Sequence, residues 1–302
     1  MSKRILTVAI DGKRPNLALA KVKSYYEKKG YEVAEDYKKL TQRVEKIFIS
    51  CLFEWNRHKV EPWLKSSCPV VVGGSGWDIN SKLPLEIEKE CPRINYGYTS
   101  RGCPRRCPWC LVWHKEGKFK PVHKLLDLWD GSSKDITLLD NNILADANWF
   151  HHVAWDAYRH GIRLHFYQGL DYRFVDRAVA SSLGMIRHKR YRFAFDEPKN
   201  FNGVDTAIKH LFDAGIKVSQ WFTLVGFNTT LKQDFERIDF LRKRGQLVYL
   251  ARYNYTRAPE YIPLARWTQN PRAFTKMTFP DFLNLPENQK FKEYWKFLFP
   301  NR

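Results

Sequence analysis

The feature that most constrains the fold is a regular alternation of short apolar strands and amphipathic helices between residues 94 and 255. The stretch 203–215, GVDTAIKHLFDAG, shows the helical half most clearly, because its apolar residues recur every three or four positions and a glycine ends it. Strands that alternate with helices pair in parallel through right-handed crossovers. Six units predict an open, partial barrel, since eight are needed to close one. The six expected strands cover residues 94–99, 135–140, 162–167, 191–196, 216–225 and 246–253.

A smaller α/β unit is predicted ahead of this series. Residues 4–10 and 46–53 have the pattern of strands, and residues 17–30 that of a helix that ends at Gly30. The predicted class is therefore α/β. We divide the chain into a small flavodoxin-like or Rossmann-like α/β domain over residues 1–92, a partial (β/α)6 barrel over residues 93–255, and a C-terminal extension over residues 256–302.

The composition restricts the cellular location and the kinds of binding partner that we expect. The net charge of +19 over 302 residues would attract a nucleic acid or an acidic protein, although simple solubility explains it equally well. No apolar run approaches the roughly 20 residues of a membrane span, and Asp11 interrupts the first apolar stretch too early for a signal peptide. We expect a soluble, cytoplasmic protein with no membrane partner. In that compartment, six cysteines favour a metal site or catalysis over a disulfide framework.

Polar residues follow the expected strands at the points where the strands end. The carboxyl ends of parallel strands meet at one edge of a sheet, and this edge carries the chemistry in α/β folds. We therefore expect these residues to converge. In chain order they are the cysteine loop at 103–110, Asp140 to Asn142, Gln168 to Asp171, Asp196 and Glu197, Gly226 to Asn228, and Arg252 to Asn254.

Three of the six cysteines lie together in the first of these loops, as Cys103, Cys107 and Cys110 in a C-x3-C-x2-C pattern. Thiolates bind zinc or iron–sulfur clusters. A cubane cluster has four irons, so three thiolates leave one iron for an exogenous ligand. Zinc is the alternative, and it would take a fourth ligand, for which His114 is available. The place of the loop at the expected catalytic edge favours the cluster, because a structural zinc has no obvious purpose there.

This motif, after the first strand of a six-repeat barrel, resembles that of the radical S-adenosylmethionine (SAM) enzymes, and the resemblance covers residues 94 to about 255. It implies a [4Fe-4S] cluster on the three cysteines and SAM as the second cofactor. In this family the free iron chelates SAM, and one electron cleaves it to methionine and a 5′-deoxyadenosyl radical. The radical abstracts hydrogen from a substrate, which the sequence does not identify.

The same resemblance implies roles for other residues. Trp109 matches the aromatic position that lies against the adenine, and LLDNN (138–142) occupies the place where the family binds the methionine amino group. TLVGFN (223–228) resembles the fifth-strand glycine motif near the adenine. QGLDYR (168–173) resembles a stretch found where a cobalamin-type N-terminal domain is present. The implied cofactor-binding residues are Trp109, Asn141, Asn142, Gln168, Arg173, Asp196, Glu197 and Gly226, with the aspartate–glutamate pair on the ribose hydroxyls.

The N-terminal unit also resembles a cobalamin-binding domain, in residues 11–30 and in PVVVGGSG (69–76). The D-x-H-x-x-G cobalamin signature is absent, so we interpret the unit as a relict or repurposed domain, and cobalamin is the less favoured cofactor. Its three cysteines, Cys51, Cys68 and Cys91, are expected to be separate thiols rather than ligands of a second cluster. A radical SAM enzyme needs an electron donor, and an acidic flavodoxin or ferredoxin would suit the basic surface.

Two further features have simpler interpretations. His151 and His152 open a predicted helix and are expected to face solvent or cap it. RHKRYR (187–192) is basic, and we interpret it as a solvated loop rather than an RNA contact. The alternative to the enzyme hypothesis is a non-catalytic zinc or iron–sulfur protein that binds nucleic acid through its basic surface.

Overall fold

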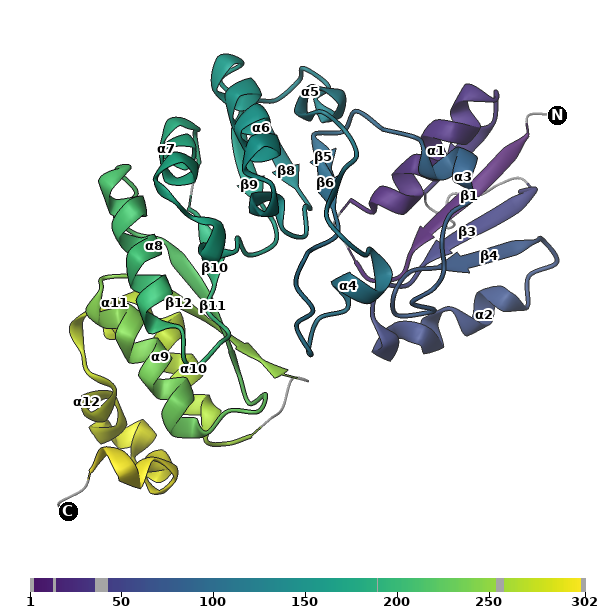
Figure 1. Cartoon of the computed structure of the whole chain (residues 1–302). Coiled ribbons are helices and arrows are strands. Elements are labelled where there is room, and N and C mark those ends of the chain that lie inside the picture. Colours follow the sequence, from purple (N-terminus) through teal and green to yellow (C-terminus); the bar gives the residue numbers. More distant parts are fainter. Residues whose placement is uncertain (1–2, 13–14, 36–42, 189, 254–257, 300–302) are drawn as a thin grey trace. The chain divides into compact units, whose positions relative to one another are not determined.

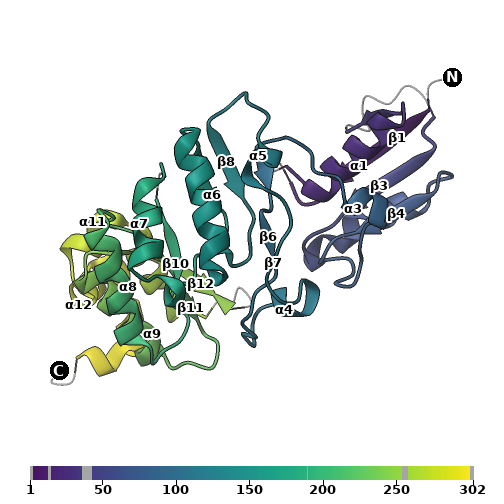
Figure 2. The same ribbon diagram turned by 45° about the horizontal axis from the view of Figure 1, so that its top comes forward.

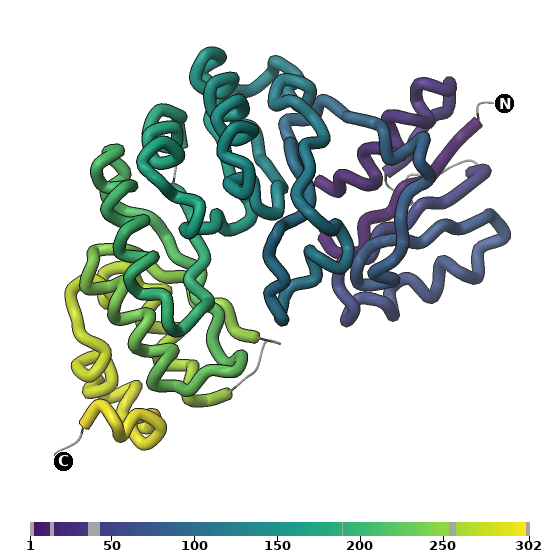
Figure 3. The backbone as a smooth tube through the Cα atoms, in the orientation of Figure 1, coloured from purple at the N-terminus to yellow at the C-terminus, as the bar shows by residue number. Residues whose placement is uncertain are grey.

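The computed structural model describes residues 3–12, 15–35, 43–188, 190–253 and 258–299. The chain forms two compact units. Unit 1 comprises Met1–Tyr98 and His123–Ile136, and unit 2 comprises Thr99–Val122 and Thr137–Arg302. The path of the chain through both can be followed along the tube in Figure 3. These divisions fall at other positions than the sequence-based boundaries after residues 92 and 255.

Unit 1 is built on a parallel sheet with the strand order β2-β1-β3-β4 (Figure 1). Successive side chains of a strand point to opposite faces. Leu6 of β1 and Ile47 of β3 therefore pack in one apolar cluster, while Ile5 and Phe48 pack with Val22 of helix α1 in another. The unit contains β1 (Arg4–Ala9), α1 (Leu17–Lys28), β2 (Glu32–Ala34), β3 (Lys46–Ser50), η2 (Glu54–Lys59), α2 (Glu61–Leu64), β4 (Val70–Gly73), α3 (Leu85–Glu88), β5 (Tyr96–Gly97) and α5 (Leu125–Leu128).

Unit 2 repeats the order of strand and helix. Strands β10, β11 and β12 form a parallel sheet, and β9 is the neighbour of β8. Two isolated parallel bridges, Arg163 with Arg187 and Leu170 with Phe193, connect β9 and the segment after it to β10 and the segment before it. The strands are β6 (Ser100–Arg101), β7 (Lys120–Pro121), β8 (Asp135–Leu138, which begins in unit 1), β9 (Arg163–Phe166), β10 (Arg192–Ala194), β11 (Gln220–Val225) and β12 (Leu247–Arg252).

Several helices of unit 2 begin at side-chain caps, and α6, α7 and α8 each bury one apolar stripe. Asp146, Asp176, Asn200 and Thr230 each accept a hydrogen bond from the first turn of the helix that follows. Helices α6, α7 and α8 follow one another side by side (Figures 1 and 2). The helices are α4 (Val112–Lys115), η3 (Ile143–Ala145), α6 (Ala147–Arg159), η4 (Tyr172–Phe174), α7 (Arg177–Met185), α8 (Phe201–Asp213), α9 (Leu231–Lys243), α10 (Tyr261–Gln269), α11 (Pro271–Lys276), α12 (Phe279–Asn284) and η6 (Pro286–Leu298).

The α/β class with parallel sheets is confirmed, and the expected strands are present but shorter. The strand expected at 94–99 is wrong as a single element, because it is divided into β5 and β6. The amides of Thr99 and Ser100 donate to the carboxylate of Asp140 at this point, so they are not available to a strand ladder. Strand β2 was not expected. Within the described residues, no helix has the length and apolar character needed to cross a membrane.

Candidate functional site

The three clustered cysteines lie in a loop of unit 2 that is closed at its base. Strands β6 and β7, on either side of the loop, pair in antiparallel fashion, and the Cys103 amide donates to the Gly117 carbonyl (3.0 Å). Gly102 has a φ of +83°, and a Cβ at this position would lie 2.2 Å from the Lys118 carbonyl oxygen. Only glycine therefore lets the two arms of the loop approach this closely.

The sulfur atoms of this loop accept hydrogen bonds. Cys103 Sγ accepts from the Arg105 amide (3.5 Å) and from Asn142 Nδ2 (3.3 Å), and Cys110 Sγ accepts from the Val112 amide (3.5 Å). Burial raises the pKa of the Cys107 and Cys110 thiols, and the neighbouring thiols raise it further. The loop without metal thus favours protonated thiols, so any metal bound here must displace protons.

Four side chains in and beside the loop, Cys103, Cys107, Cys110 and His114, carry the donors that the two metal hypotheses require. In the part of the chain that the structure describes, no three histidine, cysteine, aspartate or glutamate side chains are arranged to hold one metal ion. A cubane takes one thiolate at each of three irons, and amide donors to the sulfur atoms tune such clusters. His114, the fourth ligand of the zinc alternative, is exposed, with its ring against Trp113 (3.4 Å between centroids).

Residues after β8 hold the beginning of this loop. The buried carboxylate of Asp140 accepts from the amide and hydroxyl of Thr99 (3.0 and 2.6 Å) and from the amide and hydroxyl of Ser100 (both 2.6 Å). Burial raises the pKa of Asp140, against the four donors that favour its charged form. Asn141 Oδ1 accepts from the Gly102 amide (2.9 Å). Asp140 and Asn141 therefore fix the backbone that leads into the first cysteine.

A closed series of hydrogen bonds, all but one of them between side chains, joins the cysteine loop to the ends of three strands. We call it the polar circuit, and it contains Cys103, Asn142, Asp171, Arg173, Glu197 and Arg105. Asn142 Nδ2 donates to Cys103 Sγ and to Asp171 Oδ2 (3.2 Å). Arg173 donates to Asp171 Oδ1 from Nε (2.7 Å) and to Glu197 Oε1 from Nη1 (2.9 Å). The Arg105 guanidinium returns the series to the loop, because it donates to the same oxygen of Glu197.

One atom of this circuit is incompletely satisfied. Asn142 is 5% exposed, and its Oδ1 is buried with no hydrogen-bond partner among the described residues. The amide cannot simply be reversed, since Nδ2 faces the Asp171 carboxylate, which only accepts. An unpaired buried acceptor costs about 1–3 kcal/mol. Asn142 Oδ1 therefore has an unused capacity to accept a hydrogen bond.

Aromatic rings connect the far side of the cysteine loop to the loop after β11. Trp109 meets Phe227 edge to face (5.2 Å between centroids), and Phe227 meets Tyr253 in the same way (4.6 Å). The neighbouring Gly226 has a φ of +76°, and its amide donates to Asp234 Oδ2 (3.2 Å). A flat ring bound here would find apolar faces and exposed backbone.

A buried ion pair on α9 stabilises the backbone at the ends of β10 and β11. Asp234 and Arg237, both on α9, have side chains with 0% exposure. Arg237 donates to the carbonyls of Phe195 (2.8 Å) and Leu224 (2.7 Å), and the Tyr261 hydroxyl donates to Asp234 Oδ2 (2.6 Å). The pair thereby fixes the ends of β10 and β11. The sequence analysis did not identify it, because acidic and basic residues three apart are the ordinary pattern of a solvated helix face.

The structure brings together most, but not all, of the residues expected at the site. Cys103, Asn142, Arg173 and Glu197 share the polar circuit, and Trp109 reaches the loop that contains Gly226. Gln168 is exposed and outside the circuit. Asp196 accepts from the Leu224 amide (3.0 Å), and burial raises its pKa. Asn254 lies outside the described residues.

Two members of the circuit were not among the individually predicted cofactor-binding or metal-binding residues. Both lie in segments that were expected at this edge, Arg105 in the loop 103–110 and Asp171 at the end of 168–171, but neither was assigned a role of its own. The only available signals were the place of Asp171 at a strand end and the position of Arg105 between two of the cysteines.

In unit 1, the edge of the sheet where the strands end is occupied by closely packed backbone of the same unit. A Cβ on Gly74 would lie 2.3 Å from the Cys51 carbonyl oxygen, and one on Gly76 would lie 2.4 Å from the backbone of Phe53. The thiols of Cys51, Cys68 and Cys91 each donate to a different backbone carbonyl. The structure thus gives each of these three cysteines a separate local partner.

No protein-family model matches the chain, and no curated protein matches its sequence.

Proposed function

We propose that the chain is a radical SAM enzyme with a partial (β/α)6 barrel in unit 2. In this proposal Cys103, Cys107 and Cys110 hold a [4Fe-4S] cluster whose fourth iron binds SAM. The observation that carries the proposal is the polar circuit, which links the cysteine loop to side chains after β8, β9 and β10. A loop whose metal only stabilised the fold would not need contacts with side chains at the ends of three successive strands.

In this proposal, different residues of unit 2 bind different parts of SAM. Asn142 Oδ1, buried and unpaired, would accept from the methionine amino group. Trp109 and Phe227 would lie against the adenine. Glu197 is better placed than Asp196 for a ribose hydroxyl, because Asp196 already binds the Leu224 amide. When bound, the cluster would supply the electron that cleaves the carbon–sulfur bond of SAM.

The polar circuit itself would hold the loop still. The Arg105 and Arg173 guanidiniums share Glu197, so the loop, the segment after β9 and the segment after β10 are connected by charge-assisted hydrogen bonds. Cleavage of SAM produces a reactive species beside the substrate, so the reacting atoms must be aimed and water excluded. A rigid loop serves both needs.

An acidic electron donor, such as a flavodoxin or ferredoxin, is part of the proposal. A pocket of about 310 Å³ opens beside Cys103, and Arg106 and Lys118 at its rim are exposed. Opposite charges would steer a small acidic protein to this face. A cytoplasmic location would supply such donors.

Cobalamin has no place in this proposal. The strand order of unit 1 matches the start of the flavodoxin-like order. Nevertheless, the close approach of Gly74 and Gly76 to the segment after β3 (residues 51–53) leaves no space for a Cβ at the edge where such sheets bind ligands. Unit 1 is best interpreted as a repurposed domain.

The direct test is anaerobic reconstitution of the full chain with iron and sulfide. We expect about four irons per chain, as one cubane requires, an electron paramagnetic resonance signal after dithionite, and release of 5′-deoxyadenosine from SAM. Cys107→Ala should lose the cluster while keeping the circular-dichroism spectrum of the folded chain. Cys51→Ala is the matched control and should keep iron at the wild-type level, since its thiol binds only the Phe53 carbonyl.

The competing hypothesis predicts a different result. A zinc protein would hold one zinc and no iron, and it would release no 5′-deoxyadenosine with dithionite. Retention of full iron by Cys107→Ala would also exclude the proposed ligand set.

A further inference from the structure

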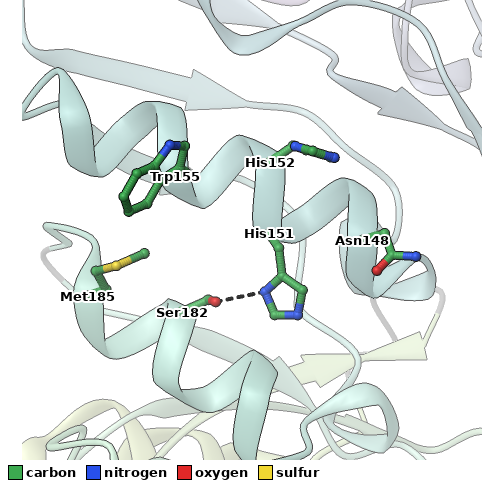
Figure 4. Close-up of a pocket in the computed structure, with 6 residues that line it drawn as sticks. All are labelled: Asn148, His151, His152, Trp155, Ser182 and Met185. Carbon is green, nitrogen blue, oxygen red and sulfur yellow. Dashed lines mark hydrogen bonds between the residues drawn. The ribbon is translucent and has the colours of Figure 1, made fainter.

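Unit 2 carries a groove that the radical SAM proposal does not use. It lies between α6 and α7, has a volume of about 540 Å³, and is lined by Asn148, His151, His152, Trp155, Ser182 and Met185 (Figure 4). His151 Nδ1 is hydrogen-bonded to Ser182 Oγ (2.7 Å), which ties the two helices together within the groove. Trp155 and Met185 come from opposite helices, and His152 is exposed.

Two exposed aromatic rings form an open stacking surface, of which Trp155 lines the groove and Tyr158 lies next to Trp155 on α6. Trp155 is 51% exposed and Tyr158 is 54% exposed, and their rings lie 5.9 Å apart at an angle of 30°. The core-facing side of α6 is taken by other residues, including Ala154 and Ala157, so these rings contribute little to the core. Exposed aromatic faces of this kind are the surfaces on which unpaired bases stack in single-strand binding proteins.

Hydrogen-bonding groups lie along the same helix. Asn148 and His152 are both exposed and line the groove with the tryptophan. An amide offers a donor and an acceptor, and so does a neutral imidazole. These are groups that read the edges of bases that are splayed out of a duplex.

The surroundings of the groove are strongly basic. Among the described residues of 151–163 and 182–192, five arginine residues stand against one acidic residue, Asp156. Arg159 follows Trp155 by one helical turn, and Arg187 follows Met185 by two residues; both arginines are exposed. The bridge between Arg163 and Arg187 places the two basic stretches side by side. Such an arrangement attracts phosphates.

We propose that the α6–α7 groove binds a segment of single-stranded nucleic acid. Bases stack on Trp155 and Tyr158, and the backbone phosphates lie near Arg159 and Arg187. A duplex would hide its bases from the aromatic surface, and an acidic protein would satisfy the arginines without using the stacked rings. The proposal does not depend on the cluster. It replaces the interpretation of residues 187–192 as only a solvated loop.

The test is fluorescence anisotropy of the full chain with labelled single strands of RNA and of DNA, each about ten nucleotides long, within the site size of such surfaces. We expect binding that weakens steeply between about 50 and 200 mM salt. Trp155→Ala should weaken binding about tenfold, because stacking of one base is lost, while Trp155→Phe should retain most of it. Arg187→Ala should weaken binding of all sequences and reduce the salt dependence.

Phe212→Ala is the matched control, since Phe212 is an equally exposed aromatic residue (58%) at the end of α8. It should change the affinity less than twofold, given the modest effect of residues outside the site. The proposal is overturned if the wild-type chain binds no single strand, if it binds a duplex of the same length equally well, or if only free mononucleotides bind. It is also overturned if Trp155→Ala and Phe212→Ala have the same effect while both retain the wild-type circular-dichroism spectrum.

Discussion

The two units end their strands in polar residues but use them in opposite ways. In unit 1, Asp11 follows β1, and its carboxylate accepts from the backbone amides of Leu52 and Phe53 and from Asn56 Nδ2 (2.9 Å). Its partners therefore lie in one neighbouring segment, and two are backbone groups. In unit 2, Asp171 follows β9 and contacts Asn142 and Arg173, which lead on to the cysteine loop and to Glu197.

Under the proposed function, this difference separates an edge that serves the fold from an edge that binds SAM. Backbone donors must be satisfied when they are buried, so Asp11 serves the fold. The polar circuit consists mostly of side chains bound to side chains, and one of its acceptors, Asn142 Oδ1, has no partner among the described residues. Perturbed and unsatisfied polar groups of this kind concentrate at functional sites.

The largest expected effect concerns the ion pairs of the two units. Arg237→Ala should lower the free energy of unfolding by about 3–5 kcal/mol, because it leaves Asp234 charged and buried without its partner. Lys21→Ala in unit 1 should cost less, about 1.5–3 kcal/mol, since Lys21 binds a backbone carbonyl and the partly exposed carboxylate of Glu88. Urea denaturation of the full chain measures both. Equal losses would contradict the prediction that the buried ion pair of unit 2 contributes more to stability than the ion pair of unit 1.

The sequence predicts the elements well because they depend on local patterns. The apolar stripe of α8 and its left-handed Gly215 (φ +84°) are visible in residues 203–215. The short strand β2 was missed, because three residues are too few to show an alternation. Strand β6 could not be separated from β5 either, since the interruption depends on Asp140, about 40 residues away in the chain.

The site was predictable only as a set of strand ends. The cysteine spacing and the polar residues after each strand located it, but their pairing depends on how neighbouring strands bring those ends together. Arg105 shows most clearly which contacts could not be predicted from the sequence. It lies between two cysteines as one basic residue among many, and only the fold brings Glu197 to it.

A second test makes the same substitution, aspartate to asparagine, at Asp171 and at Asp11. Asp171→Asn removes the charge that orients Arg173 and Asn142, so we expect the reconstituted chain to retain its iron about tenfold less tightly, the usual cost of losing a group that supports a metal ligand. Asp11→Asn should leave iron retention unchanged but destabilise the chain by about 1–3 kcal/mol, because the new amide faces a backbone N–H.

Iron release to a chelator and urea denaturation, measured on both variants, give two independent readouts. The comparison between the edges fails if Asp11→Asn loses iron as readily as Asp171→Asn, or if Asp171→Asn reduces stability more than Asp11→Asn does.

The smallest expected effect is on thiol titration in the protein without metal. Burial raises the pKa of Cys107 and of Cys91, so both should react with iodoacetamide only at higher pH than a free thiol, because the reagent attacks the thiolate. Arg105 opposes this rise at Cys107. Arg105→Ala should therefore move the alkylation midpoint of Cys107 to still higher pH and leave that of Cys91, in unit 1, where it was.

Mass spectrometry of peptides alkylated over a pH series resolves the two cysteines within one sample. Because Cys91 has the same kind of burial but lies outside the polar circuit, it reports any general change in stability caused by the substitution. A parallel shift of both midpoints would mean that Arg105 acts through the fold as a whole. A shift confined to Cys107 would place Arg105 electrostatically within the cysteine loop, which is the property that distinguishes the edge of unit 2 from that of unit 1.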